Sequence, residues 1–139
     1  MSTGIRSNSE KETFEFARKL AAGLAGGGCF AVSGGLGAGK TVFAKGFAKG
    51  LGIEDTVTSP TFIIMNRYGG GRFPFYHFDM YRINAEQAEN LGFREIFEEK
   101  GAVCLIEWPE NAAGILPKGA VRVEIKSTGE KTREIIVHD

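Results

Sequence analysis

Residues 33–46 read SGGLGAGKTVFAKG, a glycine-rich turn that joins an apolar run to a segment with helical spacing. Within this stretch, residues 34–41 (GGLGAGKT) match the phosphate-loop pattern G-x-x-x-x-G-K-[ST] at every fixed position. Glycines let backbone N–H groups converge on phosphate oxygens, while Lys40 reaches the outer phosphates and Thr41 offers its hydroxyl to Mg²⁺. The stretch therefore predicts a nucleotide-binding loop followed by a helix whose positive dipole end faces the phosphates.

The segments on both sides of the loop support this interpretation. Residues 29–33 (CFAVS) form a short apolar run typical of a buried strand, and residues 41–51 place apolar side chains at helical spacing. Residues 9–24 begin with S-x-x-E, the spacing of a capping box, and predict an amphipathic helix. A strand, then the loop, then a helix is the order that the phosphate-loop pattern requires.

The rest of the chain predicts a mixed sheet. Five more segments have strand patterns, at residues 62–68, 73–79, 102–107, 121–126 and 133–137. The first two and the last two are joined by short turns, which favours antiparallel hairpins because a parallel crossover needs about a dozen residues. Residues 84–97 predict a short helix. Residues 1–139 are thus expected to form a single α/β P-loop NTPase domain, with a mixed parallel and antiparallel sheet flanked by helices.

Composition and charge exclude several other classes. The 139 residues are 42% hydrophobic and 24% charged, as in soluble globular domains. Because 17 Lys and Arg balance 17 Asp and Glu, the chain lacks the overall positive charge that drives nonspecific nucleic-acid binding. Cys29 and Cys104 lie in apolar runs, which favours reduced core thiols. No segment approaches the roughly 20 apolar residues of a membrane span, so we expect a cytoplasmic protein without a membrane partner.

Hydrolysis of a bound nucleotide needs an acidic residue that positions Mg²⁺ or water. Glu107 ends the apolar run AVCLI, and Asp79 ends the strand-like segment FPFYHF. Strand ends beside a phosphate loop are suitable places for metal ligands. We therefore interpret Glu107 as a Mg²⁺ ligand together with Thr41, and Asp79 as the residue that polarises water or completes the metal shell. For each carboxylate, a solvated strand end is the structural alternative.

Three other features also have a structural alternative. Residues 58–62 (TSPTF) form either an ordinary turn or a switch-like loop in which Thr61 senses the terminal phosphate. His77 is interpreted as a packed or hydrogen-bonded strand residue rather than a catalyst. Trp108 fits core packing as well as a lid over the site.

Several motifs in a fixed order resemble one family. GGLGAGKT is followed by SPTF, YHFDMYR, LGFREIF, LIEWPE and GILP. This series resembles the TsaE family, the small P-loop ATPase subunit of the bacterial machinery that makes threonylcarbamoyladenosine on tRNA. The resemblance implies a compact P-loop domain that binds ATP and Mg²⁺ and hydrolyses ATP slowly. It also implies two protein partners, TsaD and TsaB, which transfer the threonylcarbamoyl group, and it implies that tRNA is reached indirectly through their complex.

The resemblance further implies which residues surround ATP. The phosphates are expected at Leu36, Gly37, Ala38, Gly39, Lys40 and Thr41, and the other nucleotide contacts at Ser9, Thr61, Trp108 and Arg133. The catalytic group implied is Lys40, Asp79 and Glu107, with Mg²⁺ on Thr41 and Glu107. One position departs from the family pattern, since Gly35 stands where an aspartate is usual. This departure is expected to preserve nucleotide binding and to weaken hydrolysis.

Two other functions stay open on the residues alone. A small-molecule P-loop kinase has the same opening motif, although residues 109–117 contain no arginine for a lid over the phosphate donor. A nucleotide-dependent docking module with negligible hydrolysis is favoured by Gly35. A GTPase is disfavoured because the chain has no N-K-x-D segment to recognise guanine. The resemblance favours the ATPase over these alternatives.

Overall fold

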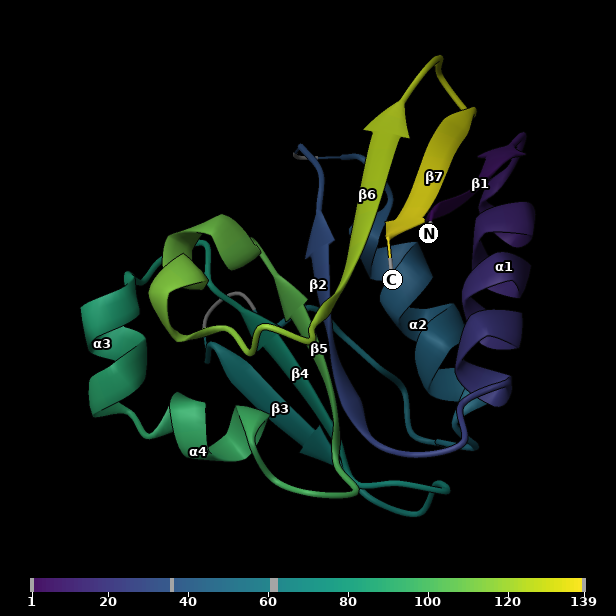
Figure 1. The fold of residues 1–139 in the computed structure, drawn as a ribbon. Coiled ribbons are helices and arrows are strands. Elements are labelled where there is room, and N and C mark those ends of the chain that lie inside the picture. Colours follow the sequence, from purple (N-terminus) through teal and green to yellow (C-terminus); the bar gives the residue numbers. More distant parts are fainter. Residues whose placement is uncertain (1, 36, 61–62, 139) are drawn as a thin grey trace.

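The computed structural model describes residues 2–35, 37–60 and 63–138, which form one seven-stranded sheet with helices on both faces (Figure 1). The strands are β1 (Ser2–Ser7), β2 (Gly28–Ser33), β3 (Met65–Tyr68), β4 (Phe75–Asp79), β5 (Val103–Glu107), β6 (Val121–Ser127) and β7 (Arg133–His138). The helices are α1 (Glu10–Ala22), α2 (Lys40–Gly50), α3 (Ala85–Asn90), α4 (Phe93–Phe97) and the 3-10 helix η1 (Pro109–Ile115). This architecture confirms the predicted α/β class.

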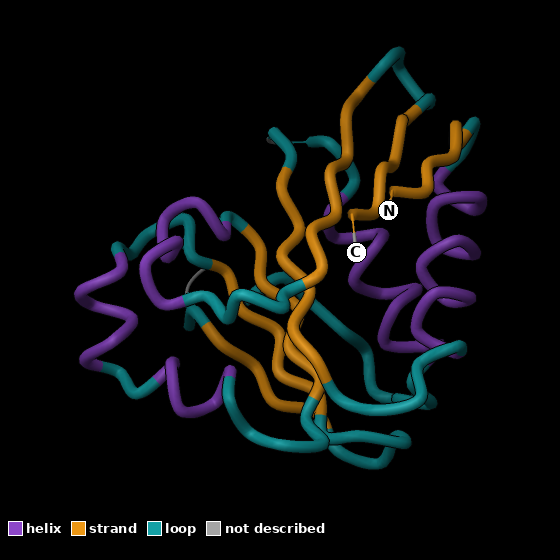
Figure 2. The backbone as a smooth tube through the Cα atoms, in the orientation of Figure 1, coloured by secondary structure: helices purple, strands orange, loops and turns teal. Residues whose placement is uncertain are grey.

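The sheet is parallel at its centre and antiparallel at both edges. Its strand order is β1-β7-β6-β2-β5-β4-β3. Strand β2 runs parallel to β5 and β6, and β5 runs parallel to β4, whereas the β3–β4, β6–β7 and β7–β1 pairs are antiparallel. Figure 2 shows the strands as one twisted layer between the helices. Both predicted hairpins are therefore confirmed, as their short connections require.

Two hydrophobic cores fill the spaces on either side of this layer. Helices α1 and α2 cover one face, and α3, α4 and η1 cover the other face (Figure 1). Under α2, the ring of Phe47 lies 5.0 Å from that of Phe30 on β2 and 6.0 Å from that of Phe75 on β4. Aromatic pairs at such distances add about 0.5–1.5 kcal/mol beyond area burial. These contacts fix α2, and the loop before it, against β2 and against β4, the strand that ends with Asp79.

Helices α1 and α2 approach each other closely at two glycines of α2. A Cβ atom on Gly46 would overlap the backbone carbonyl of Phe14, and one on Gly50 would overlap the carbonyl of Arg18. Backbone atoms cannot yield as a flexible side chain can. The two glycines are therefore required by the helix contact, although glycine lowers helix propensity by about 1 kcal/mol relative to alanine.

Replacing Gly46 by alanine is expected to lower the free energy of unfolding by about 1–3 kcal/mol, because the overlap with Phe14 forces the two helices apart. Urea denaturation of the purified chain measures this change. Gly119→Ala is the control, since a Cβ atom at Gly119 meets nothing within 4 Å. A Gly46→Ala protein as stable as the wild type would contradict the close approach of α1 and α2.

The structure differs from the sequence prediction in three elements. The pattern does not predict β1, because STGIRS holds a single large apolar residue, Ile5, and is ordered by pairing with β7. The predicted helix over residues 84–97 is two helices, α3 and α4, since Gly92 takes a left-handed conformation with φ 80° between them. The pattern does not predict η1, which begins at Pro109 directly after β5.

The N-terminal cap of α1 and the start of β3 also differ in detail from the sequence prediction. The Ser9 hydroxyl accepts a hydrogen bond from the Glu12 N–H at 3.1 Å, as a capping box requires. The Glu12 carboxylate, however, accepts from the Asn8 N–H, so the reciprocal half of the box is displaced by one residue. Strand β3 begins at Met65 rather than at residue 62, which lies outside the described residues.

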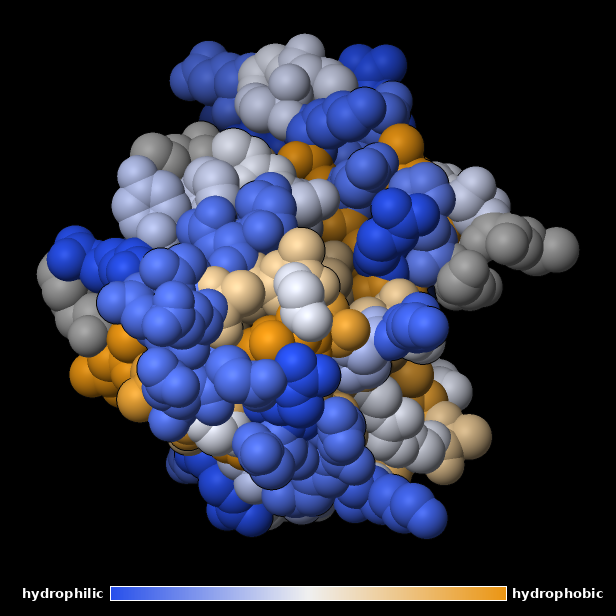
Figure 3. Space-filling view, turned by 60° about the vertical axis from the view of Figure 1, so that its left-hand side comes forward, coloured by the Kyte–Doolittle hydropathy of each residue, from blue (hydrophilic) through white to orange (hydrophobic). Residues whose placement is uncertain are grey.

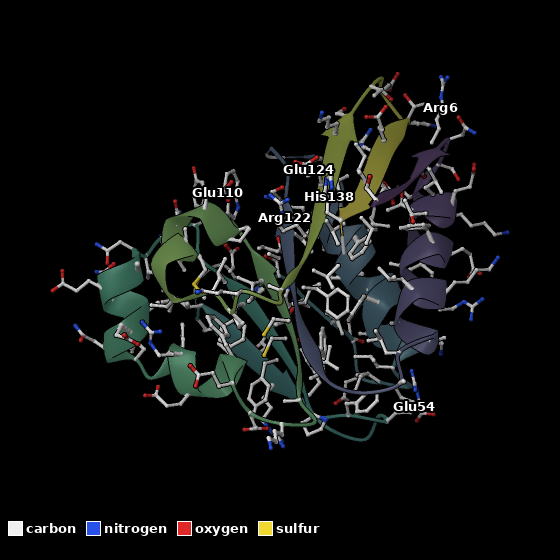
Figure 4. All side chains as sticks on the ribbon, viewed as in Figure 1. Arg6, Glu54, Glu110, Arg122, Glu124 and His138 are labelled. Atoms are coloured by element: carbon white, nitrogen blue, oxygen red, sulfur yellow. The ribbon has the colours of Figure 1, made fainter. Side chains whose placement is uncertain are left out.

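The face of β6 and β7 that lies opposite α1 and α2 carries charged side chains. Arg122 pairs in register with His138, and His138 Nε2 lies 3.3 Å from Glu124 Oε2 (Figure 4). Figure 3 shows a mostly hydrophilic surface over the side of α3 and α4, interrupted by smaller hydrophobic patches. Within the described ranges, no helix is long and apolar enough to cross a membrane.

Candidate active site

The glycine loop connects the end of β2 to the start of α2 and has the backbone that its sequence demands. Gly37 has φ 75° and Gly39 has φ 102°, values that side-chain-bearing residues rarely adopt. Gly39 occupies the N-cap position of α2 and supplies no side chain to cap it. The first N–H groups of a helix have no partner within the helix, and without a side-chain cap they suit an anion such as phosphate.

Lys40 is the first residue of α2 and is buried, with 7% of its surface exposed. Its Nζ donates a hydrogen bond to the Gly34 carbonyl oxygen at 2.8 Å and lies 3.6 Å from the ring centre of Trp108. Burial lowers the pKa of Lys40, and the nearby charges of Glu107 and Asp79 oppose this shift. The lysine is thus held over the loop by contacts that a phosphate group could replace.

Asp79 and Glu107 lie side by side at the ends of β4 and β5. They are register partners in this parallel pair, and both are buried, at 4% and 3% exposure. Asp79 Oδ1 accepts a hydrogen bond from the Tyr81 N–H at 3.0 Å, and Glu107 Oε2 lies 2.6 Å from His77 Nε2. The interpretation of His77 as a hydrogen-bonded strand residue is confirmed.

Trp108 closes the site beside the two carboxylates. It has a left-handed backbone, with φ 56°, directly after β5. Its ring contacts Lys40 and also the Tyr81 ring, which is tilted by 54° with its centre 4.9 Å away. Tyr81 is 47% exposed, so this row of side chains leads from the loop lysine to the surface. A change in the position of Lys40 would therefore alter the surroundings of both rings.

The loop, the carboxylates and Trp108 line one cavity of about 690 Å³. The predicted site residues that line it are Ser9, Gly37, Gly39, Lys40, Thr41, Asp79, Glu107, Trp108 and Arg133. Ala38 is buried behind the loop. Leu36 and Thr61 lie outside the described residues, so their expected roles stay predictions. The structure thus brings together residues from both ends of the chain and from its centre.

Sequence reasoning did not identify several other residues of the cavity wall. They are Glu10, Lys11, Thr13, Val42, Ser59, Glu130 and Lys131. Ser59 belongs to the TSPTF segment, where Thr61 was the residue singled out. Glu130 and Lys131 lie in the turn between β6 and β7, and no spacing in the sequence connects that turn to the glycine loop.

Arg133 attaches the last hairpin to the glycine loop. From the start of β7, its Nε donates to the Ala38 carbonyl at 2.9 Å, and its Nη2 donates to the Gly37 carbonyl at 3.2 Å. A guanidinium group presents several N–H donors in one plane and can therefore hold two neighbouring carbonyls. These bonds hold the two loop carbonyls against a side chain that also lines the cavity.

Replacing Arg133 by alanine is expected to weaken ATP binding by about tenfold, because the loop loses its charged hydrogen-bond donor. Isothermal titration with ATP measures the affinity. Arg122→Ala is the matched control, since Arg122 is an exposed arginine on the adjacent strand β6. Equal affinities of the two variants would show that Arg133 does not support the loop.

A glycine-rich loop between a parallel strand and a helix, with acidic residues ending β5 and β4, gives the chain the architecture of the α/β P-loop fold class. The family model described as "Threonylcarbamoyl adenosine biosynthesis protein TsaE" matches residues 7–135. The chain therefore belongs to the TsaE family.

Individual relatives agree with this assignment. The chain is 43% identical to the "tRNA threonylcarbamoyladenosine biosynthesis protein TsaE" of Bacillus subtilis, covering 94% of this chain and 81% of that protein. It is 38% identical to the protein of the same name from Treponema pallidum, over 94% and 96% of the two chains. The crystal structure of Bacillus subtilis YdiB is similar with a TM-score of 0.85 and 38% identity, covering 99% of this chain and 84% of that chain.

Proposed function

We propose that this protein is a cytoplasmic ATP-binding subunit that hydrolyses ATP slowly and supports turnover of a TsaD–TsaB complex making threonylcarbamoyladenosine on tRNA. The proposal rests on one observation: a single cavity is lined by Lys40, Thr41, Asp79 and Glu107. The names of the relatives, which refer to tRNA threonylcarbamoyladenosine biosynthesis, support the process in which the subunit acts.

In this proposal, the loop N–H groups and the N-terminus of α2 bind the phosphates of ATP. Lys40 exchanges the Gly34 carbonyl and the face of Trp108 for phosphate oxygens. A charged lysine donor next to phosphate makes shorter and stronger hydrogen bonds than it makes to a neutral carbonyl. Binding therefore releases Lys40 from its contact with Trp108, whose other neighbour is the half-exposed Tyr81.

The residues at the cavity also fit Mg²⁺. Its preferred ligands are oxygen atoms, and in nucleotide sites it binds one or two carboxylates together with phosphates and water. Thr41 and Glu107 would hold the ion, with Asp79 beside them, because all three line the cavity. Mg²⁺ bound to the phosphates supplies charge neutralisation during phosphoryl transfer. Asp79 would orient the attacking water, a role supported by its register pairing with Glu107, the proposed metal ligand.

The experiment that tests the proposal is phosphate release from ATP by the purified protein, alone and with TsaD, TsaB and tRNA. Slow release that rises when the partners are added is the expected result. Release that depends on another small-molecule acceptor would instead favour a kinase. Binding of ATP without release under any condition would favour the docking module. The kinase alternative would need a lid with an arginine over the phosphate donor. In the structure, the segment after Trp108 is η1, a short helix packed beside α3, and it contains no arginine.

The docking module without hydrolysis has one residue in its favour, Gly35. A Cβ atom at Gly35 meets nothing within 4 Å, so the backbone leaves room for a side chain to begin there. Gly35→Asp is expected to raise ATP hydrolysis by about tenfold by adding a carboxylate near the phosphates. Steady-state phosphate release measures the effect, and Gly35→Asn controls for size without charge. Equal rates for both variants and the wild type would show that this position does not limit hydrolysis.

A further inference from the structure

His77 lies in β4, between β5 and the edge strand β3, and its side chain contacts Glu107. On β4 it precedes Asp79 by two residues, so both side chains lie on the same face of the sheet. Its register partner on β5 is Leu105, and Glu107 is two residues further along that strand. The His77 ring has no exposed surface and stacks on Phe75, with ring centres 6.2 Å apart and planes at 15°. The position of the imidazole is therefore fixed by packing.

The polar contact of this ring is with Glu107. His77 Nε2 lies 2.6 Å from Glu107 Oε2, and an ionised carboxylate can only accept, so the imidazole donates from Nε2. Glu107 lines the nucleotide cavity, whereas His77 is not among the described residues that do so. The histidine thus contacts the proposed metal ligand from behind, on the side away from the nucleotide.

Within the described part of the chain, the second ring nitrogen of His77 adds no hydrogen bond to the one that His77 makes with Glu107. His77 Nδ1 is buried and has no hydrogen-bond partner among the residues that the structure describes. A buried polar atom without a partner costs free energy, which an apolar side chain of similar size would avoid. The hydrogen bond to Glu107 is consequently the feature of His77 that a leucine or phenylalanine at this position could not supply.

We propose that His77 is a positioning residue that holds the Glu107 carboxylate in the orientation needed to bind Mg²⁺ with ATP. The inference rests on the proposed function. A glutamate side chain has several rotatable bonds, and one fixed oxygen restricts which way the other can face. Hydrogen-bond partners of metal ligands act in this way, and their loss commonly reduces metal affinity or activity by about 10–100-fold.

The test is direct metal binding to the full chain saturated with a non-hydrolysable ATP analogue, using Mn²⁺ as the probe and the EPR signal of the free ion. His77→Leu is expected to weaken Mn²⁺ binding by about 10-fold or more. Affinity for the ATP analogue without metal should change little. His77→Gln, which places an amide donor near the position of Nε2, is expected to restore most of the Mn²⁺ affinity.

Phe78→Leu provides the control for packing, because Phe78 is a fully buried ring on the same strand whose side chain packs on the opposite face of the sheet. It is expected to lower stability without changing Mn²⁺ affinity. Wild-type Mn²⁺ affinity in His77→Leu, or an equal loss in Phe78→Leu, would overturn the inference and leave the proposed function intact. A wild-type chain that binds no ATP analogue would instead overturn the proposed function, and the inference with it.

A measurement on the wild type covers the case in which His77→Leu does not fold. The chain has two histidines, so the ring nitrogen signals of His77 and His138 can be assigned by NMR with a single His138 variant. Addition of Mg²⁺ to the ADP-bound protein is expected to shift the signals of His77 and to leave those of His138 unchanged. Unshifted His77 signals would overturn the inference.

Discussion

Replacing Lys40 by alanine is expected to reduce ATP affinity by about 100-fold or more, which is close to loss of binding at ordinary concentrations. The lysine is buried beside the loop, and its Nζ lies between the Gly34 carbonyl and the Trp108 ring, where the phosphates would enter. Lys45, on the next turn of α2, is exposed and is not among the described residues that line the cavity, so it is not positioned to replace Lys40. Isothermal titration with ATP measures the affinity.

Lys45→Ala is the matched control for this variant. It removes one positive charge from the same helix at an exposed position and is expected to bind ATP like the wild type. Thermal denaturation of both variants separates lost binding from lost folding. Unchanged ATP affinity in a folded Lys40→Ala protein would overturn the assignment of the cavity as the phosphate site.

Asp79→Asn is expected to lower ATP hydrolysis by about 100-fold or more while ATP affinity changes little. The amide has the shape of the carboxylate and keeps an oxygen that can accept from the Tyr81 N–H. It lacks the negative charge that the proposed role in orienting and activating water requires. Phosphate release, measured alone and with the partner proteins, gives the rate, and titration with ATP gives the affinity.

The control for Asp79 is Asp55→Asn, which makes the same chemical change at an exposed position. That variant is expected to hydrolyse ATP at the wild-type rate. Hydrolysis at the wild-type rate by Asp79→Asn would exclude Asp79 from the reaction. A loss of ATP binding together with hydrolysis would show instead that Asp79 acts in binding the nucleotide.

The predictions for Lys40 and Asp79 depend on different parts of the molecule. The sequence alone predicts the surroundings of Lys40 better than those of Asp79. Lys40 belongs to a contiguous motif, and Gly37 and Gly39 in that motif take the left-handed backbone that only glycine adopts readily. Asp79 depends on a neighbour from another strand, because its place in the site is defined by pairing with Glu107. The sequence predicts both strand ends but does not establish that they are register partners.

The sequence also does not predict elements that depend on contacts with distant segments. Strand β1 has few apolar residues and is ordered by β7, which follows it by more than a hundred positions in the chain. Conversely, the sequence predicts one helix where the structure has two. The helical pattern after Asn84 continues through Gly92, but the backbone turns at this glycine and forms α3 and α4 as separate helices. Pattern alone could not separate a glycine within a helix from a glycine between two helices.

The sequence by itself determined the phosphate loop, the two hairpins, the α/β class and the resemblance to one family, because each rests on spacing within a short segment or on the order of such segments. The tertiary structure decided the partners of those segments. It placed Arg133 on the loop carbonyls, Glu107 beside Asp79, and His77 behind Glu107. Local preferences act over a few residues, whereas these contacts form only when distant strands are buried together in one sheet.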